Sequence, residues 1–289
     1  MITYTLPDFT QGLGLNLFFV RLVRTYPDMA MPNVEIGSIY GCFPGCVMNG
    51  GRAVVRERTS EKDIERTFSI LAEYELIPRI TCTNMLATRE TLQDEYFNTI
   101  LRIGAKYTAE VIVYSDMVRD YVRDTYGLRT VLSTTRGITS LDEFNECARD
   151  YDYAVLDFNV HKDPAFLSGL AEPEKAEIMV NEFCMKGCTH RREHYLHNSQ
   201  DQIDSTLTPF ECKANKASFF EHKPGHPVIF TTEEVQKTHD TYHIPYFKIV
   251  GRGTPFETNL EALTYYLIKP AARAQARTLV AEAMRAQRS

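Results

Sequence analysis

The fold is decided most clearly by the stretch EVIVYSDMVRDYVRDTYGLRTVLS, which spans Glu110–Ser133. It begins with a short apolar run, Glu110–Tyr114, continues with an amphipathic segment, Ser115–Tyr126, and ends with a second apolar run, Arg129–Ser133. Gly127 follows the amphipathic segment, at the position where a glycine commonly ends a helix. Short apolar runs joined by a helix are typical of buried parallel strands. This stretch therefore predicts a strand–helix–strand unit of an α/β protein.

The same alternation extends in both directions along the chain. Strands are predicted at Val34–Tyr40, Ile77–Cys82, Glu110–Tyr114, Arg129–Ser133, Tyr153–Leu156, Glu177–Val180, Pro227–Phe230 and Tyr246–Val250. Helices are predicted at Asn16–Tyr26, from Ser60, at Glu90–Ile103, at Ser115–Tyr126, from Ser140, from Thr231, at Glu257–Ile268 and at Ala271–Ala286. Ser140 stands three residues before a glutamate, and Thr231 begins its helix in similar style, which is the spacing of a capping box.

Eight strands that alternate with helices predict a parallel sheet closed into a (β/α)8 TIM-type barrel. The length of 289 residues suits such a barrel, which usually takes about 250 residues. An open doubly wound sheet is the alternative, but no glycine-rich nucleotide-binding turn follows an early strand. We therefore expect a single barrel domain over residues 1–289, with an irregular insertion near 198–224.

Composition narrows the classes of function. The net charge of −6 and the pI of about 5.8 do not indicate a nucleic-acid partner, because binding to phosphate backbones favours a basic face. The sequence has no evident secretion signal and no apolar run long enough to span a membrane, so we expect a cytoplasmic protein. Seven cysteines, an odd number, favour metal binding or catalysis over a disulfide framework.

Polar side chains follow the ends of the predicted strands, where barrel enzymes place their active sites. Asn49 and Arg52 follow the first predicted strand, Asp157 follows the fifth, Lys248 lies in the eighth, and Arg252 follows it. We predict that Asn49, Arg52 and Arg252 bind substrate. We predict that Asp157 and Lys248 are catalytic.

The pairing of Lys248 stays open at this point. A bare ammonium is costly to bury, so Lys248 must either pair, with Asp157 or Glu182, or point into the barrel mouth. Asp116 and Arg136, which follow the third and fourth predicted strands, are further polar residues of the same rim.

The sharpest chemical signal is a group of cysteines. Cys184 and Cys188 are separated by three residues, and Cys212 follows in the same region. Clustered thiolates suit zinc or an iron–sulfur cluster, with a fourth ligand still to be supplied. Three candidates for that ligand stay open: Cys46, Cys42 and His194. The alternative is that several of these cysteines are simply small buried apolar residues.

The segment His190–His197 is rich in hydrogen-bond donors. It is either a solvated helix start or a group that aims Arg191, Arg192 and His194 at an anionic substrate, since arginine binds carboxylates and phosphates through paired hydrogen bonds. We predict that His194 is catalytic and that Arg191 and Tyr195 bind substrate. A cysteine nucleophile with His194 as its base also stays open.

These strand ends resemble the collagenase-like peptidase family U32. The resemblance rests on Phe247–Arg252, on Glu177–Asn181 running into Cys184 and Cys188, and on Gly37–Cys42 leading to Arg52. It implies a barrel and, in several branches of the family, a four-iron cluster that serves oxygen-independent hydroxylation of RNA bases or of the ubiquinone precursor. It implies that Cys184, Cys188 and Cys212 are cluster ligands, which favours iron–sulfur over zinc.

The leading hypothesis is an iron–sulfur (4Fe-4S) barrel enzyme that acts by redox or oxygen-atom transfer on a small or tethered substrate. A redox partner protein is a further candidate partner. The metal ligands would be Cys184, Cys188, Cys212 and Cys46. The first alternative is a peptidase that uses a cysteine or a metal-bound water. The second is a non-catalytic protein in which a structural zinc holds the loop 198–224.

Overall fold

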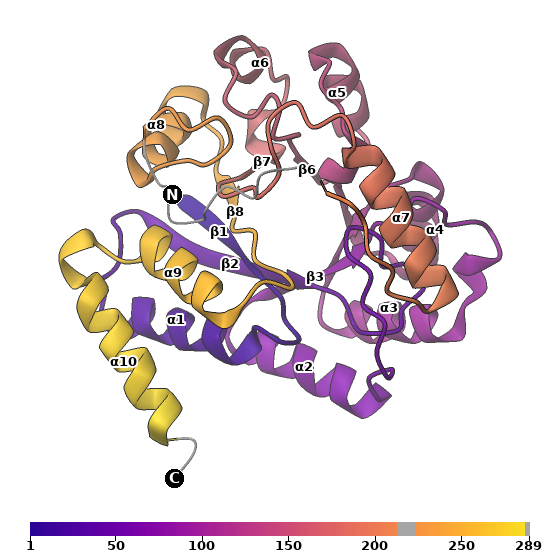
Figure 1. Ribbon diagram of the computed structural model, residues 1–289, viewed down its shortest axis with the longest axis horizontal. Helices are drawn as coiled ribbons and strands as arrows, with labels where there is room; N and C mark the ends of the chain where they lie inside the picture. The colour runs from indigo at the N-terminus through magenta and orange to yellow at the C-terminus, as the bar shows by residue number, and fades with distance from the viewer. Residues whose placement is uncertain (213–223, 287–289) are drawn as a thin grey trace.

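The computed structural model describes residues 1–212 and 224–286. Its strands close into one parallel barrel in the order β1 to β8, which confirms the predicted (β/α)8 fold (Figure 1). The strands are β1 (Ile2–Pro7), β2 (Val34–Gly41), β3 (Ile77–Cys82), β4 (Glu110–Val113), β5 (Arg129–Leu132), β6 (Tyr153–Val155), β7 (Ala176–Met179) and β8 (Tyr246–Lys248). Every neighbouring pair is parallel, including β1 with β8, which closes the ring.

The helices surround this barrel, and α10 reaches away from it towards the C-terminus (Figure 1). They are α1 (Leu13–Thr25), α2 (Glu61–Glu73), α3 (Glu95–Lys106), α4 (Asp116–Tyr126), α5 (Leu141–Ala148), α6 (Pro164–Ser168), α7 (Arg191–Asp204), α8 (Thr232–Tyr242), α9 (Phe256–Leu267) and α10 (Arg273–Ala286). Among the described residues, no helix combines the length and the apolar character needed to cross a bilayer.

Two of the three helix-end predictions are confirmed. Gly127 ends α4 in the left-handed conformation, at φ 64°, which a glycine adopts without steric cost. Thr231 and Glu234 form a complete capping box at the start of α8. The capping box predicted at Ser140 is wrong, because Ser140 occupies the N-cap of α5 but its side chain makes no capping hydrogen bond.

The number of strands was predicted correctly, but one member of the set was wrong. Ile2–Pro7 is a strand that the prediction missed, because its threonines interrupt the apolar run expected of a buried strand. Pro227–Phe230 is not a strand, and only an isolated bridge joins Ile229 to Asn181. Val228 and Ile229 instead pack among side chains of the barrel interior. This run is therefore apolar because it plugs the barrel rather than because it belongs to the sheet.

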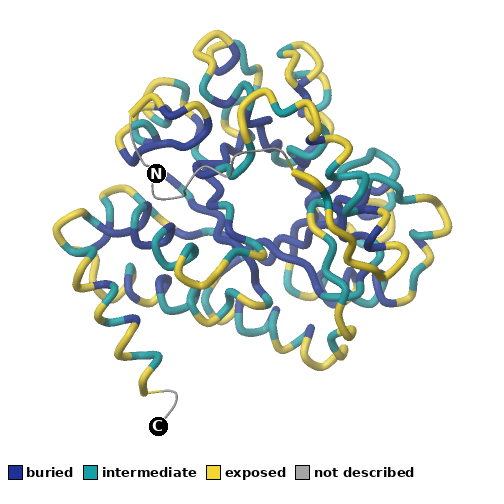
Figure 2. The backbone as a smooth tube through the Cα atoms, viewed as in Figure 1, coloured by how far each residue is buried: buried dark blue, intermediate teal, exposed yellow. Residues whose placement is uncertain are grey.

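Side chains alternate between the two faces of each strand. Those on the outer face pack with the helices in one large apolar core. Figure 2 shows that many residues of the ring at the centre of the molecule are buried. Side chains on the inner face include a group of six buried polar residues: Thr5, Ser38, Arg79, Glu110, Glu177 and Lys248. A smaller apolar cluster includes strand residues nearer the carboxyl ends: Tyr40, Ile112, Val131, Val155 and Met179.

Arg79 is the centre of the polar group. Its Nε lies 2.6 Å from Glu110 and its Nη1 lies 2.6 Å from Glu177, and all three side chains are at most 4% exposed. Arg79 and Glu177 both also contact the hydroxyl of Thr5, which Ser38 contacts in turn. Five strands are thereby tied together inside the barrel, and charge-assisted hydrogen bonds join four of them, β1, β3, β4 and β7.

Helix α7 links two sides of the barrel mouth. At its start, the guanidinium of Arg191 lies 4.0 Å from the ring centre of Phe158, which follows β6. Near its end, the hydroxyl of Ser199 accepts the backbone N–H of Met85, which follows β3, at 3.1 Å. The predicted irregular insertion near 198–224 therefore begins later than expected, since its first residues are helical. Residues 213–223 of that insertion lie outside the described residues.

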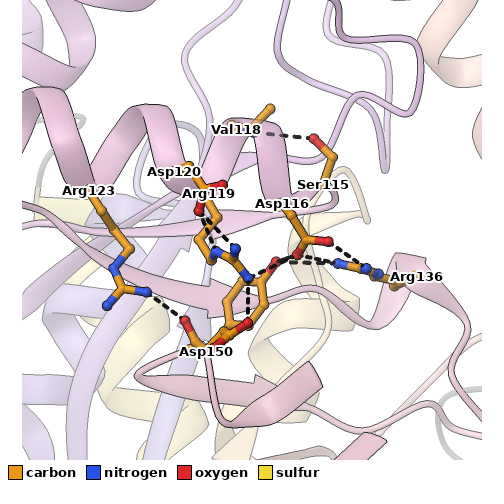
Figure 3. Close-up of polar contacts among 9 residues, drawn as sticks. Ser115, Asp116, Val118, Arg119, Asp120, Arg123, Arg136 and Asp150 are labelled. Carbon is orange, nitrogen blue, oxygen red and sulfur yellow. Dashed lines mark hydrogen bonds and ion pairs between the residues drawn. The ribbon is translucent and has the colours of Figure 1, made fainter. Parts of the chain in front are cut away.

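Asp116 and Arg136 belong to a network of ion pairs that joins α4 to the turn after β5 (Figure 3). The guanidinium of Arg136 donates to both carboxylate oxygens of Asp116, each at 2.9 Å, and the hydroxyl of Tyr151 donates to one of them at 3.0 Å. Asp116 and Arg136 therefore form an ion pair with each other, which gives these two rim residues a structural role.

Replacing Arg136 with glutamine is expected to raise the pKa of Asp116. Hydrogen bonds from Arg136 are the main cause that lowers this pKa from 3.8 to about 2. A carboxyl with a lowered pKa contributes stability that is present above its ordinary pKa and is lost as the pH falls through about 2. An NMR titration of the Asp116 carboxyl measures the change. Arg123→Gln is the control, because Arg123 donates to the backbone carbonyl of Asp150 instead; an equal shift in both variants would contradict the assignment.

Candidate functional site

Three of the predicted metal ligands meet at one small enclosed cavity of about 80 Å³. Cys184 and Cys188 reach it from the loop between β7 and α7, and Cys212 reaches it from the segment after α7. Two imidazoles, those of His190 and His194, line the same cavity. The tertiary structure thus brings together sulfur and nitrogen donors from both ends of α7.

Hydrogen bonds to the backbone hold the Cys184–Cys188 loop in place. One carboxylate oxygen of Glu182 accepts the N–H of Cys184 at 3.0 Å, and the side-chain carbonyl of Asn159 accepts the N–H of Gly187 at 2.8 Å. Gly187 has φ 75°, a left-handed conformation that strains most other residues. The loop is therefore positioned from β6 as well as from β7.

Phe210 holds the Cys212 segment against α7. Its ring lies parallel to the imidazole of His194, with the two ring centres 4.5 Å apart, and it also contacts the ring of His197. The stack brings the chain that carries Cys212 back to the first turns of α7. An aromatic residue two positions before Cys212 is a signal that the sequence analysis did not use.

The cysteines of this cavity fit a metal chemically but are not arranged around one point. Burial raises the pKa of Cys184 to about 12 although Arg191 opposes the shift, and Cys184 and Cys188 are joined by a hydrogen bond. The thiol of Cys184 is therefore held as a protonated group, and a metal would displace its proton on binding. Within residues 1–212 and 224–286, no three His, Cys, Asp or Glu side chains stand ready to hold a metal ion.

Cys46 is not brought to this cavity. It is 3% exposed, lies in the large apolar core, and is close enough to Cys42 and Cys82 for the three thiols to influence one another's pKa. The structure does not place Cys46 beside Cys184 as a fourth ligand, because the loop after β2 directs Cys46 towards the core. Of the three candidate ligands, His194 is the one that lines the cavity.

Two residues of α7, Arg191 and Tyr195, lie close to Asp157, which follows β6. Arg191 is 9% exposed, its guanidinium lies 5.0 Å from the ring centre of Tyr195, and it pairs with Glu182 at 3.4 Å. Because Arg191 is buried and paired, it is not part of a solvated helix start. Asp157 accepts two hydrogen bonds from Asn159, and burial raises its pKa although Arg191 opposes the shift.

Lys248 faces a different acid from those expected. Burial lowers its pKa to about 8, and Glu177 opposes that shift. Neither Asp157 nor Glu182 is within ion-pair distance of it in the described part of the chain. Its Nζ lies 4.1 Å from the ring centre of Tyr40. Lys248 therefore belongs to the β8 and β2 side of the mouth, because barrel closure orders the strands β7, β8, β1 and β2.

The remaining predicted residues lie on this same side. Arg252 donates to the hydroxyl of Thr81 and also contacts the thiol of Cys42. Arg52 is exposed beside the turn that follows β8. Asn49 is fully buried, and its amide donates to the backbone carbonyl of Phe43 at 3.1 Å. Asn49 therefore holds the loop after β2 and has no exposed surface.

Comparisons with known proteins bear on the fold. No protein-family model and no curated protein matches the chain. Among solved structures, it is similar to the U32 peptidase Mk0906, with a TM-score of 0.55 and 13% sequence identity over 88% of this chain and 94% of that chain. This chain shares the barrel fold of a U32 peptidase. It is also similar to the spore cortex-lytic enzyme SleL of Bacillus cereus, with a TM-score of 0.43 and 11% identity over 92% of this chain and 74% of that chain.

Proposed function

We propose that this chain is an enzyme of the collagenase-like peptidase family that holds an iron–sulfur cluster, of the four-iron type, through Cys184, Cys188 and Cys212. The observation that carries the proposal is the meeting of these cysteines at one cavity, although α7 separates the third from the first two. Thiolate sulfur is the donor that such clusters take. The barrel fold shared with a U32 peptidase supports the family assignment.

A bound cluster supplies one-electron redox chemistry. The residues of the chain position and protonate the substrate beside it. Arg191 lines the cysteine cavity and also covers Phe158, so it stands between the cluster site and the barrel interior. Asp157, with its raised pKa, is suited to hold a proton there. The substrate is a small molecule or a tethered group, and a redox partner protein delivers the electrons.

The test is an analysis of iron, sulfide and zinc, with a visible absorption spectrum, on protein purified without oxygen. We expect brown protein with about four irons and about four sulfides per chain, as for a cluster held by cysteine ligands. Colourless protein that stays free of iron after reconstitution with iron and sulfide would sink the iron–sulfur proposal.

A structural zinc is the second candidate, and one observation favours it. The cavity offers three thiols and two imidazoles but no fourth cysteine among the described residues, and a Cys₃His set is a common closed zinc site. The zinc would tie the segment of Cys212 to the start of α7. About one zinc per chain, with no iron and no catalysed reaction, is the result expected of this candidate.

Peptide hydrolysis is the third candidate, and the name of the structural neighbour suggests it. Unlike the first two candidates, peptide hydrolysis by a cysteine nucleophile does not need a bound metal. Peptide cleavage that survives both chelation and loss of the cluster would favour a cysteine nucleophile over the metal-based proposals.

A further inference from the structure

Three cations gather around Tyr40 at the mouth of the barrel, apart from the cysteine cavity. The Nζ of Lys248 lies over the Tyr40 ring. Burial raises the pKa of Tyr40 to about 12, and both Arg252 and Arg52 are close enough to oppose that shift. Arg252 is also close enough to Lys248 to lower its pKa by repulsion.

The loops after β2 and β8 bring the two arginines together. A Cβ on Gly51 would lie 3.4 Å from Nη2 of Arg252, and a Cβ on Gly253 would lie 3.4 Å from Cδ of Arg52. Each arginine therefore packs on the glycine that neighbours the other in sequence. Gly253 has φ 72°, so the turn itself favours glycine.

Two acids, Glu177 and Asp8, act on these cations electrostatically, Glu177 on Lys248 and Asp8 on Arg252, but neither forms an ion pair with them. Glu177 directs one carboxylate oxygen to both Arg79 and Thr5. Asp8 accepts hydrogen bonds from Thr10 and from the backbone N–H of Gln11. Among residues 1–212 and 224–286, no carboxylate lies within 4.0 Å of a side-chain nitrogen of Lys248, Arg252 or Arg52.

Buried positive charge without a partner is costly, and Lys248 is only 7% exposed. The hydrogen bonds of Arg252 go to neutral groups, the hydroxyl of Thr81 and the thiol of Cys42, and Asp8 acts on it only from beyond ion-pair distance. An anion from outside the chain would complete this arrangement. Guanidinium groups bind oxyanions through paired hydrogen bonds, and a lysine adds a point charge.

We propose that Arg252, Lys248 and Arg52 form a binding site for the oxyanion of a small-molecule ligand, a carboxylate or a phosphate group. The proposal rests on the proposed function only in that it takes the barrel mouth as the place where substrate binds. It names the charge of that substrate and the side of the mouth, β8 and β2, where the charged end binds. It does not depend on the identity of the metal.

The experiment is a thermal-unfolding titration of the full chain with inorganic phosphate and, separately, with acetate, at constant ionic strength. It is done on the protein as purified and again after metal removal. A site with this chemistry gives a saturable rise of roughly 2–4 °C at about ten times the dissociation constant. The anion that produces the rise identifies the group as phosphate or carboxylate.

Arg252→Gln is the decisive variant, because glutamine keeps a donor for Thr81 but removes the charge. We expect it to abolish the rise while leaving the melting temperature in anion-free buffer unlowered, since no acid loses a partner. Arg285→Gln, at the end of α10, removes the same charge far from the mouth and keeps the full rise. No rise in the wild-type chain, or an equal rise in Arg252→Gln, overturns the proposal. Neither result depends on the metal content. A failure of the iron–sulfur proposal can therefore be distinguished from a failure of this one.

Discussion

Replacing Arg79 with methionine is expected to lower the free energy of unfolding by about 3–5 kcal/mol. Arg79 is 3% exposed and pairs with Glu110 and Glu177, which are both fully buried. Methionine fills much of the same space but leaves Glu177 with only the more distant Lys248, and Glu110 with only the partly exposed Arg129. An uncompensated buried charge costs far more than the original ion pair contributed. Urea unfolding followed by circular dichroism measures the loss.

The matched control is Arg102→Met. Arg102 pairs with Glu61 at 2.9 Å, but both side chains are more than half exposed, so we expect a change within about 0.5 kcal/mol. A loss below about 1 kcal/mol in Arg79→Met would show that the buried carboxylates find other partners or neutralise.

The pH dependence of the Arg79 variant gives a second test. Burial favours a raised pKa for Glu177, but Arg79 and Lys248 hold this pKa below its ordinary value. The native carboxylate therefore contributes stability that is present above the ordinary pKa of glutamate and is lost as the pH falls through its lowered pKa. In Arg79→Met the carboxyl is easier to protonate. We expect the stability gap between wild type and variant to narrow as the pH is lowered.

Replacing Cys184 with alanine is expected to reduce the bound metal at least roughly tenfold, because a thiolate ligand is lost outright. Cys184 is the partly buried thiol that contacts Cys188 at the cavity. Iron, sulfide and zinc contents of the anaerobically purified variant measure the effect. Cys147→Ala is the matched control, since Cys147 lies on α5 beside Arg136 and is expected to keep the metal. Full metal retention in Cys184→Ala would remove the site assignment.

The fourth ligand is decided by a second pair of variants. His194 lines the cavity with the three cysteines, whereas Cys46 lies in the apolar core near Cys82. We expect His194→Ala to lose metal and Cys46→Ala to keep it, with some loss of stability from the cavity left in the core. Metal loss in a folded Cys46→Ala protein would instead identify Cys46, in the loop after β2, as the fourth ligand.

Local patterns in the sequence predicted most of the elements but not every partner. The helix cap at Gly127 and the capping box at Thr231 depend on neighbours within one turn, so they were readable from sequence. The run Pro227–Phe230 was misassigned because burial in a barrel plug and burial in a sheet select the same apolar residues.

The candidate site was predicted in its residue types and only partly in its geometry. The spacing of Cys184 and Cys188 and the nearness of Cys212 in sequence indicated one cysteine group, and the structure joins them at one cavity. The stack of Phe210 on His194 that brings Cys212 back was not predicted, because it depends on how the chain returns along α7.

By itself, the sequence determined the barrel class, the helix ends at Gly127 and Thr231, and the grouping of Cys184, Cys188 and Cys212, because these follow from spacing and from neighbours nearby in sequence. Only the tertiary structure decided that Arg79 pairs with Glu177, that Cys46 stays in the core, and that Lys248 and Arg252 stand together with no described carboxylate within ion-pair distance. These pairings join strands that are far apart in sequence. They exist only once β8 closes against β1, and no local pattern carries that information.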